Sequence, residues 1–212
     1  MGECDMDKFF NIFDYIEFRG DLSLKERPFN EVDNLILSML SYVNYDGIVG
    51  DLSEGIDKAL LLKNVTDKLK DMSRDEIYMG VIIPYDIVKL AYAIVDTKRF
   101  SNMKVCCFEN IINEKANMQF AAVTFILPDD TVFISYRGTD DTLVGWKEDF
   151  HMMFESPLPS QIKAEEYLKE VAEMHKGKIL LGGHSKGGNL SVWAAVNACP
   201  QIRERIANVY SN

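Results

Sequence analysis

The residues best suited to chemistry lie in the segment GHSKG at positions 183–187, which matches the pattern G-x-S-x-G. The apolar run KILLGG precedes it, and a stretch rich in small residues that is typical of a helix follows. A serine in such a strand-to-helix turn is held in a strained geometry with its hydroxyl projecting, and a side chain at either flanking glycine would collide with backbone. The pattern therefore predicts Ser185 as a nucleophile. The alternative is a tight connection without chemistry.

A serine that attacks a carbonyl carbon needs two backbone N–H groups aimed at the developing oxyanion. One is supplied by the residue after the nucleophile, here Lys186, and the other by a separate loop. The segment YRGTDD follows a β-rich run, where the carboxyl end of a strand would lie. We expect Thr139 to be the second donor, and its hydroxyl offers a further hydrogen bond. The neighbouring Asp140 and His184 are candidates for substrate contacts. An ordinary polar turn is the alternative.

The remaining members of a serine triad are harder to assign. The usual chain order is serine, acid, histidine, but Glu204 is the only acidic residue after Ser185 and no histidine follows. The His184 side chain should diverge from the serine hydroxyl. We expect His175 to be a solvated residue at a helix end, near the opposite edge of the sheet. His151 should lie roughly 13 Å from the site along its helix.

Loss of the nucleophile or the histidine of a serine triad costs about a million-fold in turnover. We therefore expect little activity from these 212 residues alone, and we expect them to be a fragment of a longer product. A degenerate hydrolase that binds a ligand without turnover is the alternative. Transfer of the acyl group to an acceptor other than water is a third possibility, which the sequence does not separate from hydrolysis.

Two further features are predicted near the serine turn. Asp149 and Trp146 lie three residues apart on one helical face, so Asp149 can bond Arg137 and brace the oxyanion loop. A solvated Asp149 is the alternative. An apolar rim could contact an acyl group, unless its residues pack in the core. The rim residues are Phe150, Met152, Met153 and Phe154.

Helical patterns dominate the first part of the chain. Asn30 can cap a helix whose apolar positions run from Val32 to Val43. Two more helical patterns run through Leu60–Leu69 and Ile87–Ile94, and Gly and Pro residues separate them. Residues 1–115 are therefore predicted to form a mainly helical region.

Residues 116–212 are predicted to hold the sheet and the serine turn. The runs FAAVTFIL and TVFISY, joined by PDD, indicate a β-hairpin. Helical patterns follow near 144–154 and 164–174, then the strand KILLGG, a helix over 187–198 and the start of a buried strand at 207–210. Helices alternating with apolar strands predict a mostly parallel sheet flanked by helices. We expect one α/β domain over residues 1–212, truncated in its C-terminal part.

The segments YRGTDDTLVGWKEDF and GGHSKGGNLSVWAA resemble the class 3, fungal-type lipases of the α/β-hydrolase superfamily, especially a bacterial branch related to them. The segment FNEVDNLILSMLSYV is similar to the N-terminal helical region of that branch. The resemblance implies an α/β-hydrolase fold and an esterase or lipase-like activity on an acyl ester. It carries over Ser185 as nucleophile, Thr139 as oxyanion residue and Lys186 as backbone donor. It assigns the acid and the histidine to no residue here.

Composition limits the partners. The formal net charge of -10 repels nucleic acid and anionic membranes, and no basic patch offsets it. No apolar run approaches the roughly 20 residues of a membrane-spanning helix, and the N-terminus lacks the pattern of a secretory signal. The four cysteines have neither disulfide density nor zinc spacing. We therefore expect reduced thiols, a cytoplasmic location, no metal and no cofactor, with a small-molecule or lipid acyl ester as the partner.

Overall fold

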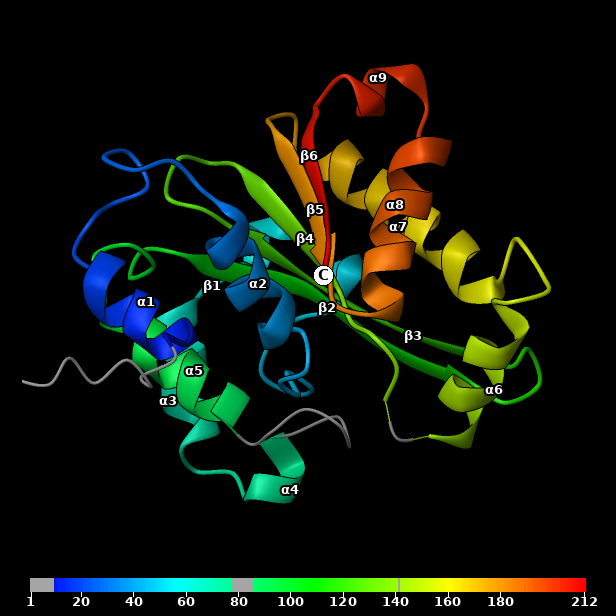
Figure 1. The fold of residues 1–212 in the computed structure, drawn as a ribbon, viewed down its shortest axis with the longest axis horizontal. Coiled ribbons are helices and arrows are strands. Elements are labelled where there is room, and N and C mark those ends of the chain that lie inside the picture. Colours follow the sequence, from blue (N-terminus) through cyan, green and yellow to red (C-terminus); the bar gives the residue numbers. More distant parts are fainter. Residues whose placement is uncertain (1–9, 78–85, 141) are drawn as a thin grey trace, which may run out of the picture.

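A six-stranded mixed sheet with helices on both faces is the framework of the chain (Figure 1). The computed structural model describes residues 10–77, 86–140 and 142–212. The strands lie side by side in chain order, from β1 to β6. Their bounds are β1 Leu60–Leu61, β2 Lys104–Asn113, β3 Met118–Ile126, β4 Val132–Tyr136, β5 Ile179–Gly183 and β6 Ile206–Ser211.

Six helices of the described chain confirm the predicted helical patterns, and three are not predicted. Their bounds are α1 Ile12–Arg19, α2 Glu31–Leu40, α3 Leu62–Leu69, α4 Arg74–Ile77, α5 Asp86–Val95, α6 Leu143–His151, α7 Pro159–Met174, α8 Lys186–Asn197 and α9 Pro200–Arg203, with short 3-10 turns at Leu52–Glu54 and Ile56–Lys58. Asn30 caps α2 as predicted, because its side chain accepts hydrogen bonds from the N–H groups of Val32 and Asp33. The Asp33 side chain accepts from the Asn30 N–H in return, which completes a capping box.

The sheet changes direction at β4, which corrects the prediction of a mostly parallel sheet. The pairs β1–β2, β2–β3 and β3–β4 are antiparallel, and only β4–β5 and β5–β6 are parallel. Antiparallel neighbours need only a short turn, whereas parallel neighbours need a long crossover. Here the helices α6 and α7 provide the crossover from β4 to β5, and α8 and α9 provide the one from β5 to β6. The predicted hairpin of β3 and β4 is confirmed.

Strand β2 lies inside the region predicted to be mainly helical. Helices outnumber strands in the described part of that region, but β2 itself is not predicted from the sequence. Its pairing with β3 shifts register between Cys106 and Glu109, and Cys107 has a φ of 54°. Such a bulge puts consecutive residues on one face, so the alternation that marks a strand is lost. Both Cys106 and Cys107 are buried. The pair Leu60–Leu61 likewise forms the short strand β1, ahead of α3 rather than inside it.

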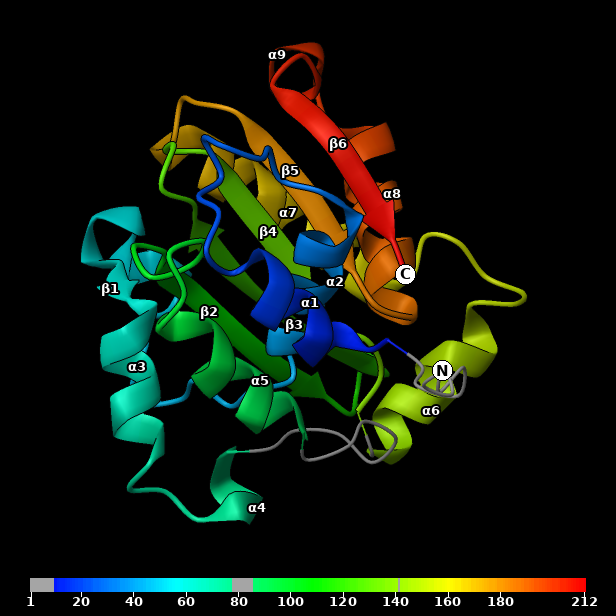
Figure 2. The ribbon, with the colours of Figure 1, turned by 60° about the vertical axis from the view of Figure 1, so that its left-hand side comes forward.

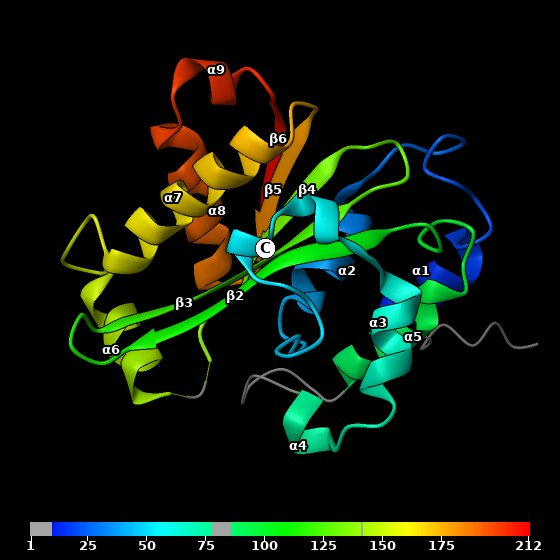
Figure 3. The ribbon, with the colours of Figure 1, turned by 180° about the vertical axis from the view of Figure 1, so that it is seen from behind.

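Helices lie on both faces of the sheet (Figures 1 and 3), and an apolar cluster fills the space on each face. Helices α1, α2, α3 and α5 cover one face, and α7 and α8 cover the other. Alternate residues of β4 belong to the two clusters, because Phe133 packs with the first group whereas Ile134 and Tyr136 pack with the second. Helices therefore pack on both faces of the sheet at β4 and β5.

The predicted final strand exists as β6, but it is largely exposed rather than buried. Residues 207–209 are exposed, and β6 has β5 as its only strand neighbour within the described part of the chain. Helix α8 packs on one face of β6. The apolar pattern of Ala207 and Val209 predicts the strand correctly, but a local pattern does not indicate whether a neighbour covers it.

Candidate active site

Ser185 occupies the turn between β5 and α8. Its backbone angles are φ 57° and ψ -125°, a combination whose strain costs about 1–3 kcal/mol for a non-glycine residue. Two backbone hydrogen bonds hold the turn: Ser185 N–H donates to the carbonyl of Asn212 at 2.9 Å, and Gly187 N–H donates to that of His184 at 3.0 Å. The serine is exposed, whereas Gly183 and Lys186 beside it are buried. The fold therefore imposes a strained backbone on one accessible hydroxyl.

The two flanking glycines are required by close backbone packing, as the sequence predicts. A Cβ atom on Gly187 would lie 2.1 Å from the carbonyl oxygen of Tyr136. A Cβ atom on Gly183 would lie 2.3 Å from the carbonyl carbon of Gly187 and 2.6 Å from the same Tyr136 oxygen. Real Cβ atoms do not approach backbone so closely, so the last residue of β4 leaves room only for glycine.

The loop that carries Thr139 lies against the serine turn. Tyr136 of β4 pairs with Gly183 of β5, so the two parallel strands end at the same edge of the sheet (Figure 2). A Cβ atom on Gly138 would lie 2.6 Å from the carbonyl oxygen of His184 and 3.3 Å from the Cβ of Ser185. Within residues 10–77, 86–140 and 142–212, the backbone N–H groups of Thr139 and Lys186 have no hydrogen-bond acceptor. Both groups are therefore candidates for hydrogen bonds to a ligand beside Ser185.

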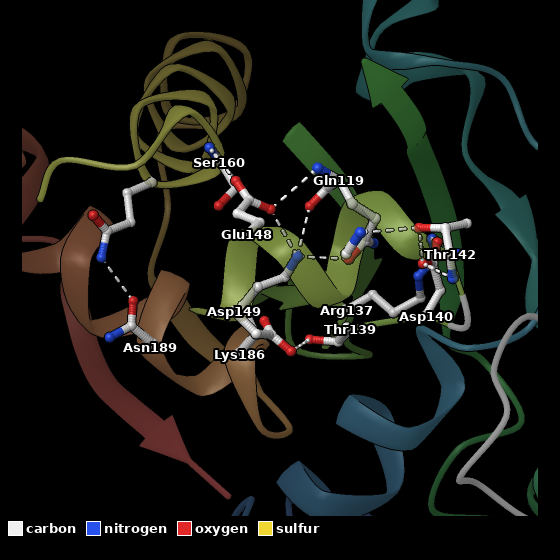
Figure 4. Close-up of polar contacts among 12 residues, drawn as sticks. Gln119, Arg137, Thr139, Asp140, Thr142, Glu148, Asp149, Ser160, Lys186 and Asn189 are labelled. Atoms are coloured by element: carbon white, nitrogen blue, oxygen red, sulfur yellow. Dashed lines mark hydrogen bonds and ion pairs between the residues drawn. The ribbon is translucent and has the colours of Figure 1, made fainter. Parts of the chain in front are cut away.

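Asp149 braces the loop after β4 through Thr139, whereas the sequence predicts Arg137 as its partner (Figure 4). The Thr139 hydroxyl donates to Asp149 Oδ2 at 2.6 Å. The Arg137 guanidinium donates to Asn110 Oδ1 at 3.0 Å and to Asp140 Oδ2 at 3.3 Å. The helix-face argument finds the right helix, but it does not determine which loop residue comes within reach of the carboxylate.

Asp140 connects the same loop to the start of α6. Its Oδ1 accepts hydrogen bonds from the N–H of Thr142 at 3.0 Å and from the Thr142 hydroxyl at 2.6 Å, and its Oδ2 accepts from Arg137. The Thr142 hydroxyl in turn caps α6 by accepting from the N–H of Gly145 at 3.1 Å. Asp140 is buried, and these bonds direct its carboxylate into the protein.

The Lys186 side chain runs from the serine turn into the protein interior. Its Nζ donates to the backbone carbonyl of Gln119 at 2.8 Å, to Gln119 Oε1 at 2.5 Å and to Glu148 Oε2 at 2.9 Å. Burial lowers the pKa of Lys186, and the Glu148 carboxylate opposes this effect. Because an ammonium group has three donors and all three are used, Lys186 is not placed to accept the proton of Ser185.

None of the three histidines bonds the Ser185 hydroxyl among the contacts of the described residues. His184 Nδ1 lies 3.1 Å from the Tyr42 hydroxyl, and burial lowers the pKa of His184. His151 is half-buried on the last turn of α6. His175 ends α7 as predicted, but it is buried rather than solvated, and burial lowers its pKa. It is covered because Gly177, in the turn before β5, folds back against the imidazole ring.

A polar network behind the turn is not predicted by the sequence reasoning. The side chain of Asn212 accepts from Asn34 Nδ2 at 2.9 Å, and it donates to Ser38 Oγ and to the Gly183 carbonyl, each at 3.2 Å. Asn34 and Ser38 are buried on α2. Two polar residues four positions apart on an otherwise apolar helix are a signal that the sequence does offer. Their partner Asn212 is not found by local spacing, because it lies 178 residues from Asn34.

The apolar rim residues lie on and just after α6. Phe150, Met153 and Phe154 are exposed, with exposed fractions of 63%, 66% and 83%. The alternative of core packing is therefore wrong for these three side chains. Met152 is half-buried. Leu143 and Trp146 are also exposed on this helix.

No group of three or more His, Cys, Asp and Glu side chains in the described part of the chain is arranged to hold a metal ion. None of the helices described there combines the length and the apolar character that crossing a membrane requires.

The fold and the site define an α/β protein with a strained, exposed serine at the edge where its parallel strands end. Residues 94–212 match the Mbeg1-like family. This match spans more than half of the 212 residues and includes both Thr139 and Ser185, so the chain belongs to the Mbeg1-like family. No curated protein and no solved structure matched the chain. The family name states no activity, and a functional assignment therefore depends on the geometry of the site.

Proposed function

We propose that this protein is a serine hydrolase of the esterase or lipase type, built on an α/β-hydrolase-like fold. The observation that carries the proposal is the strained and exposed Ser185, with the Thr139 loop packed against its turn. Ser185 Oγ would bond to the ester carbonyl carbon, and the alcohol would leave with the serine proton. Water would then hydrolyse the acyl-serine. The N–H groups of Thr139 and Lys186, which have no acceptor among the described residues, would stabilise the oxyanion in both steps.

We further propose that the acid and the histidine are supplied from outside these 212 residues. The carboxyl end of β6 lies directly beside the serine turn, because Ser211 pairs with Gly183 and the Asn212 carbonyl accepts from Ser185 N–H. A segment that followed Asn212 in a longer product would therefore enter the site next to the nucleophile. This placement suits a general base for Ser185.

The exposed apolar side chains of α6 and the residues after it support an ester with an apolar acyl group. Phe150, Met153 and Phe154 expose apolar surface on and after α6, the helix that braces Thr139. The half-buried imidazole of His184, beside Ser185, remains a candidate for a substrate contact, and the bonds of Asp140 favour a structural role for that residue. The thiols of Cys106 and Cys107 are free, in keeping with a proposed cytoplasmic location.

A non-catalytic binding protein is the second candidate. It is favoured by the absence, among the described contacts, of any histidine bonded to Ser185. In that case the exposed serine and the backbone amides of Thr139 and Lys186 would bind a carbonyl or carboxylate group without turnover.

A fluorophosphonate probe tests the proposal on the longest natively expressed product. We expect covalent labelling of the wild type and of Ser156→Ala, which removes another exposed serine, and no labelling of Ser185→Ala. Peptide mass spectrometry would locate the adduct. Labelling that persists in Ser185→Ala would refute the assignment of Ser185 as the nucleophile. An unlabelled wild type that nevertheless binds an acyl ester would favour the binding protein.

A further inference from the structure

Helix α6 carries two adjacent carboxylates that reach two different parts of the site (Figure 4). Asp149 accepts from the hydroxyl of Thr139 in the loop after β4. Glu148 accepts from Nζ of Lys186, the first residue of α8. Thr139 and Lys186 are the residues whose N–H groups are proposed to hold the oxyanion. One helix therefore contacts the side chains of both donors.

Glu148 is the point at which four elements meet. Its Oε1 accepts from the N–H of Ser160 in α7 at 3.1 Å, and its Oε2 accepts from the N–H of Gln119 in β3 at 3.1 Å and from Lys186. The Lys186 and Glu148 side chains are 2% and 1% exposed. A buried ion pair is often no more stabilising than apolar side chains of similar volume, so stability alone is a weak reason for this one. Its location suggests a role in geometry.

We propose that the Glu148–Lys186 ion pair is a positioning device, which fixes α6 and the serine turn so that the two oxyanion donors keep their separation. Glu148 acts on the Lys186 amide through the Lys186 side chain, and on Thr139 through Asp149, its neighbour in α6. The catalytic consequence rests on the proposed function, whereas the structural consequence does not. Displacement of a reacting group by about 1 Å can reduce a rate about a hundredfold.

A purely structural role is the competing explanation, and the chain offers a matched control. Arg99 and Asp33 form a second buried ion pair, with side chains 1% and 0% exposed. This pair ties the turn after α5 to the first turn of α2, and neither residue contacts Thr139, Lys186 or Ser185 in the described structure. Breaking it should destabilise the fold without moving the donors.

The experiment compares Glu148→Gln with Asp33→Asn, and Lys186→Met with Arg99→Met. Crystal structures of the four variants would give the distance between the backbone nitrogen atoms of Thr139 and Lys186. We expect this distance to change by about 1 Å in Glu148→Gln and in Lys186→Met, and to remain as in the wild type in the two control variants. Fluorophosphonate kinetics on the longest native product, corrected for the folded fraction, should show a maximal inactivation rate about a hundredfold lower in Glu148→Gln, with an unchanged probe affinity.

The outcomes separate this inference from the proposed function. If the donor distance in Glu148→Gln changes no more than in Asp33→Asn, the positioning role is refuted, whatever the kinetics show. If the wild type is not labelled but the distance changes, the hydrolase proposal fails and the positioning role stands. Should Glu148→Gln not fold, the double variant Lys186→Met/Glu148→Gln leaves no buried unpaired charge. In this double variant the distance between the backbone nitrogen atoms of Thr139 and Lys186 must also change, and an unchanged distance refutes the positioning role.

Discussion

Replacing Ser185 by glycine should stabilise this protein, although it removes the proposed nucleophile. The serine has φ 57° and ψ -125°, and holding a non-glycine residue in such a region costs about 1–3 kcal/mol. Glycine adopts positive φ without this strain, but it adds about 0.4–1 kcal/mol of backbone entropy to the unfolded chain. Because the strain exceeds the entropy over most of these ranges, we expect Ser185→Gly to raise the free energy of unfolding by about 1 kcal/mol.

Ser185→Ala separates the strain from the loss of the hydroxyl, because alanine keeps the Cβ atom. The Ser185 side chain donates or accepts no hydrogen bond among the described contacts, so the alanine variant should match the wild type within about 0.5 kcal/mol. Urea denaturation followed by circular dichroism would measure all three proteins. With a denaturant slope of about 3 kcal/mol/M, the glycine variant should unfold at a urea midpoint about 0.3 M higher.

A glycine variant that is less stable than the alanine variant would refute the reasoning. At a position with ordinary backbone angles, glycine should be less stable than alanine by about 0.5–1 kcal/mol. If Ser185→Gly unfolds at a lower midpoint than Ser185→Ala, the turn is not strained at residue 185. The strained geometry proposed for the serine turn would then be wrong, independently of any measurement of activity.

Three further predictions follow from the site. Gly187→Ala should lower the free energy of unfolding by about 3 kcal/mol, because the new Cβ would lie 2.1 Å from the Tyr136 carbonyl oxygen, and chemical denaturation measures this loss. Thr139→Val removes the hydroxyl bound to Asp149, and it should slow fluorophosphonate labelling about tenfold while Thr139→Ser retains the wild-type rate. Burial lowers the pKa of His175, so the unfolded chain binds the extra proton, and stability should fall as the pH drops through about 6.5. His175→Gln should flatten that decrease in urea titrations at pH 7 and pH 5.5.

Each of these predictions has a contradicting result. A wild-type stability for Gly187→Ala would mean that β4 does not crowd the turn. Equal labelling rates for Thr139→Val and Thr139→Ser would remove the Asp149 brace from the account. A pH dependence of unfolding that is identical with and without His175 would show that its imidazole is protonated as readily in the folded state as in the unfolded chain.

The features that the sequence predicts correctly depend on local patterns. The cap at Asn30, the hairpin of β3 and β4, and the turn at Ser185 each follow from residues within a few positions of one another. Their chemistry restricts the backbone wherever they occur, so no knowledge of distant partners is needed. The close contact of the Thr139 loop with Ser185 follows one step further, from the rule that parallel strands end at a common edge.

The features that the sequence does not predict depend on distant partners or on an interrupted alternation of side chains. The bulge at Cys107 hides β2, because it disrupts the alternation that identifies a strand. The role of Glu148 becomes visible only when β3, α7 and α8 converge on it, and residues 29 and 38 positions away cannot be paired by local spacing. The burial of His175 likewise depends on how the following turn folds back.

The most direct test of the central claim is a crystal structure of the longest native product after reaction of Ser185 with a fluorophosphonate. The account predicts a phosphoryl oxygen about 2.7–3.1 Å from the backbone nitrogen atoms of both Thr139 and Lys186. It also predicts that the bracing bond between Thr139 and Asp149 is preserved. A phosphoryl oxygen that points to solvent, or that contacts neither amide, would contradict the claim that these two loops form an oxyanion site around the serine.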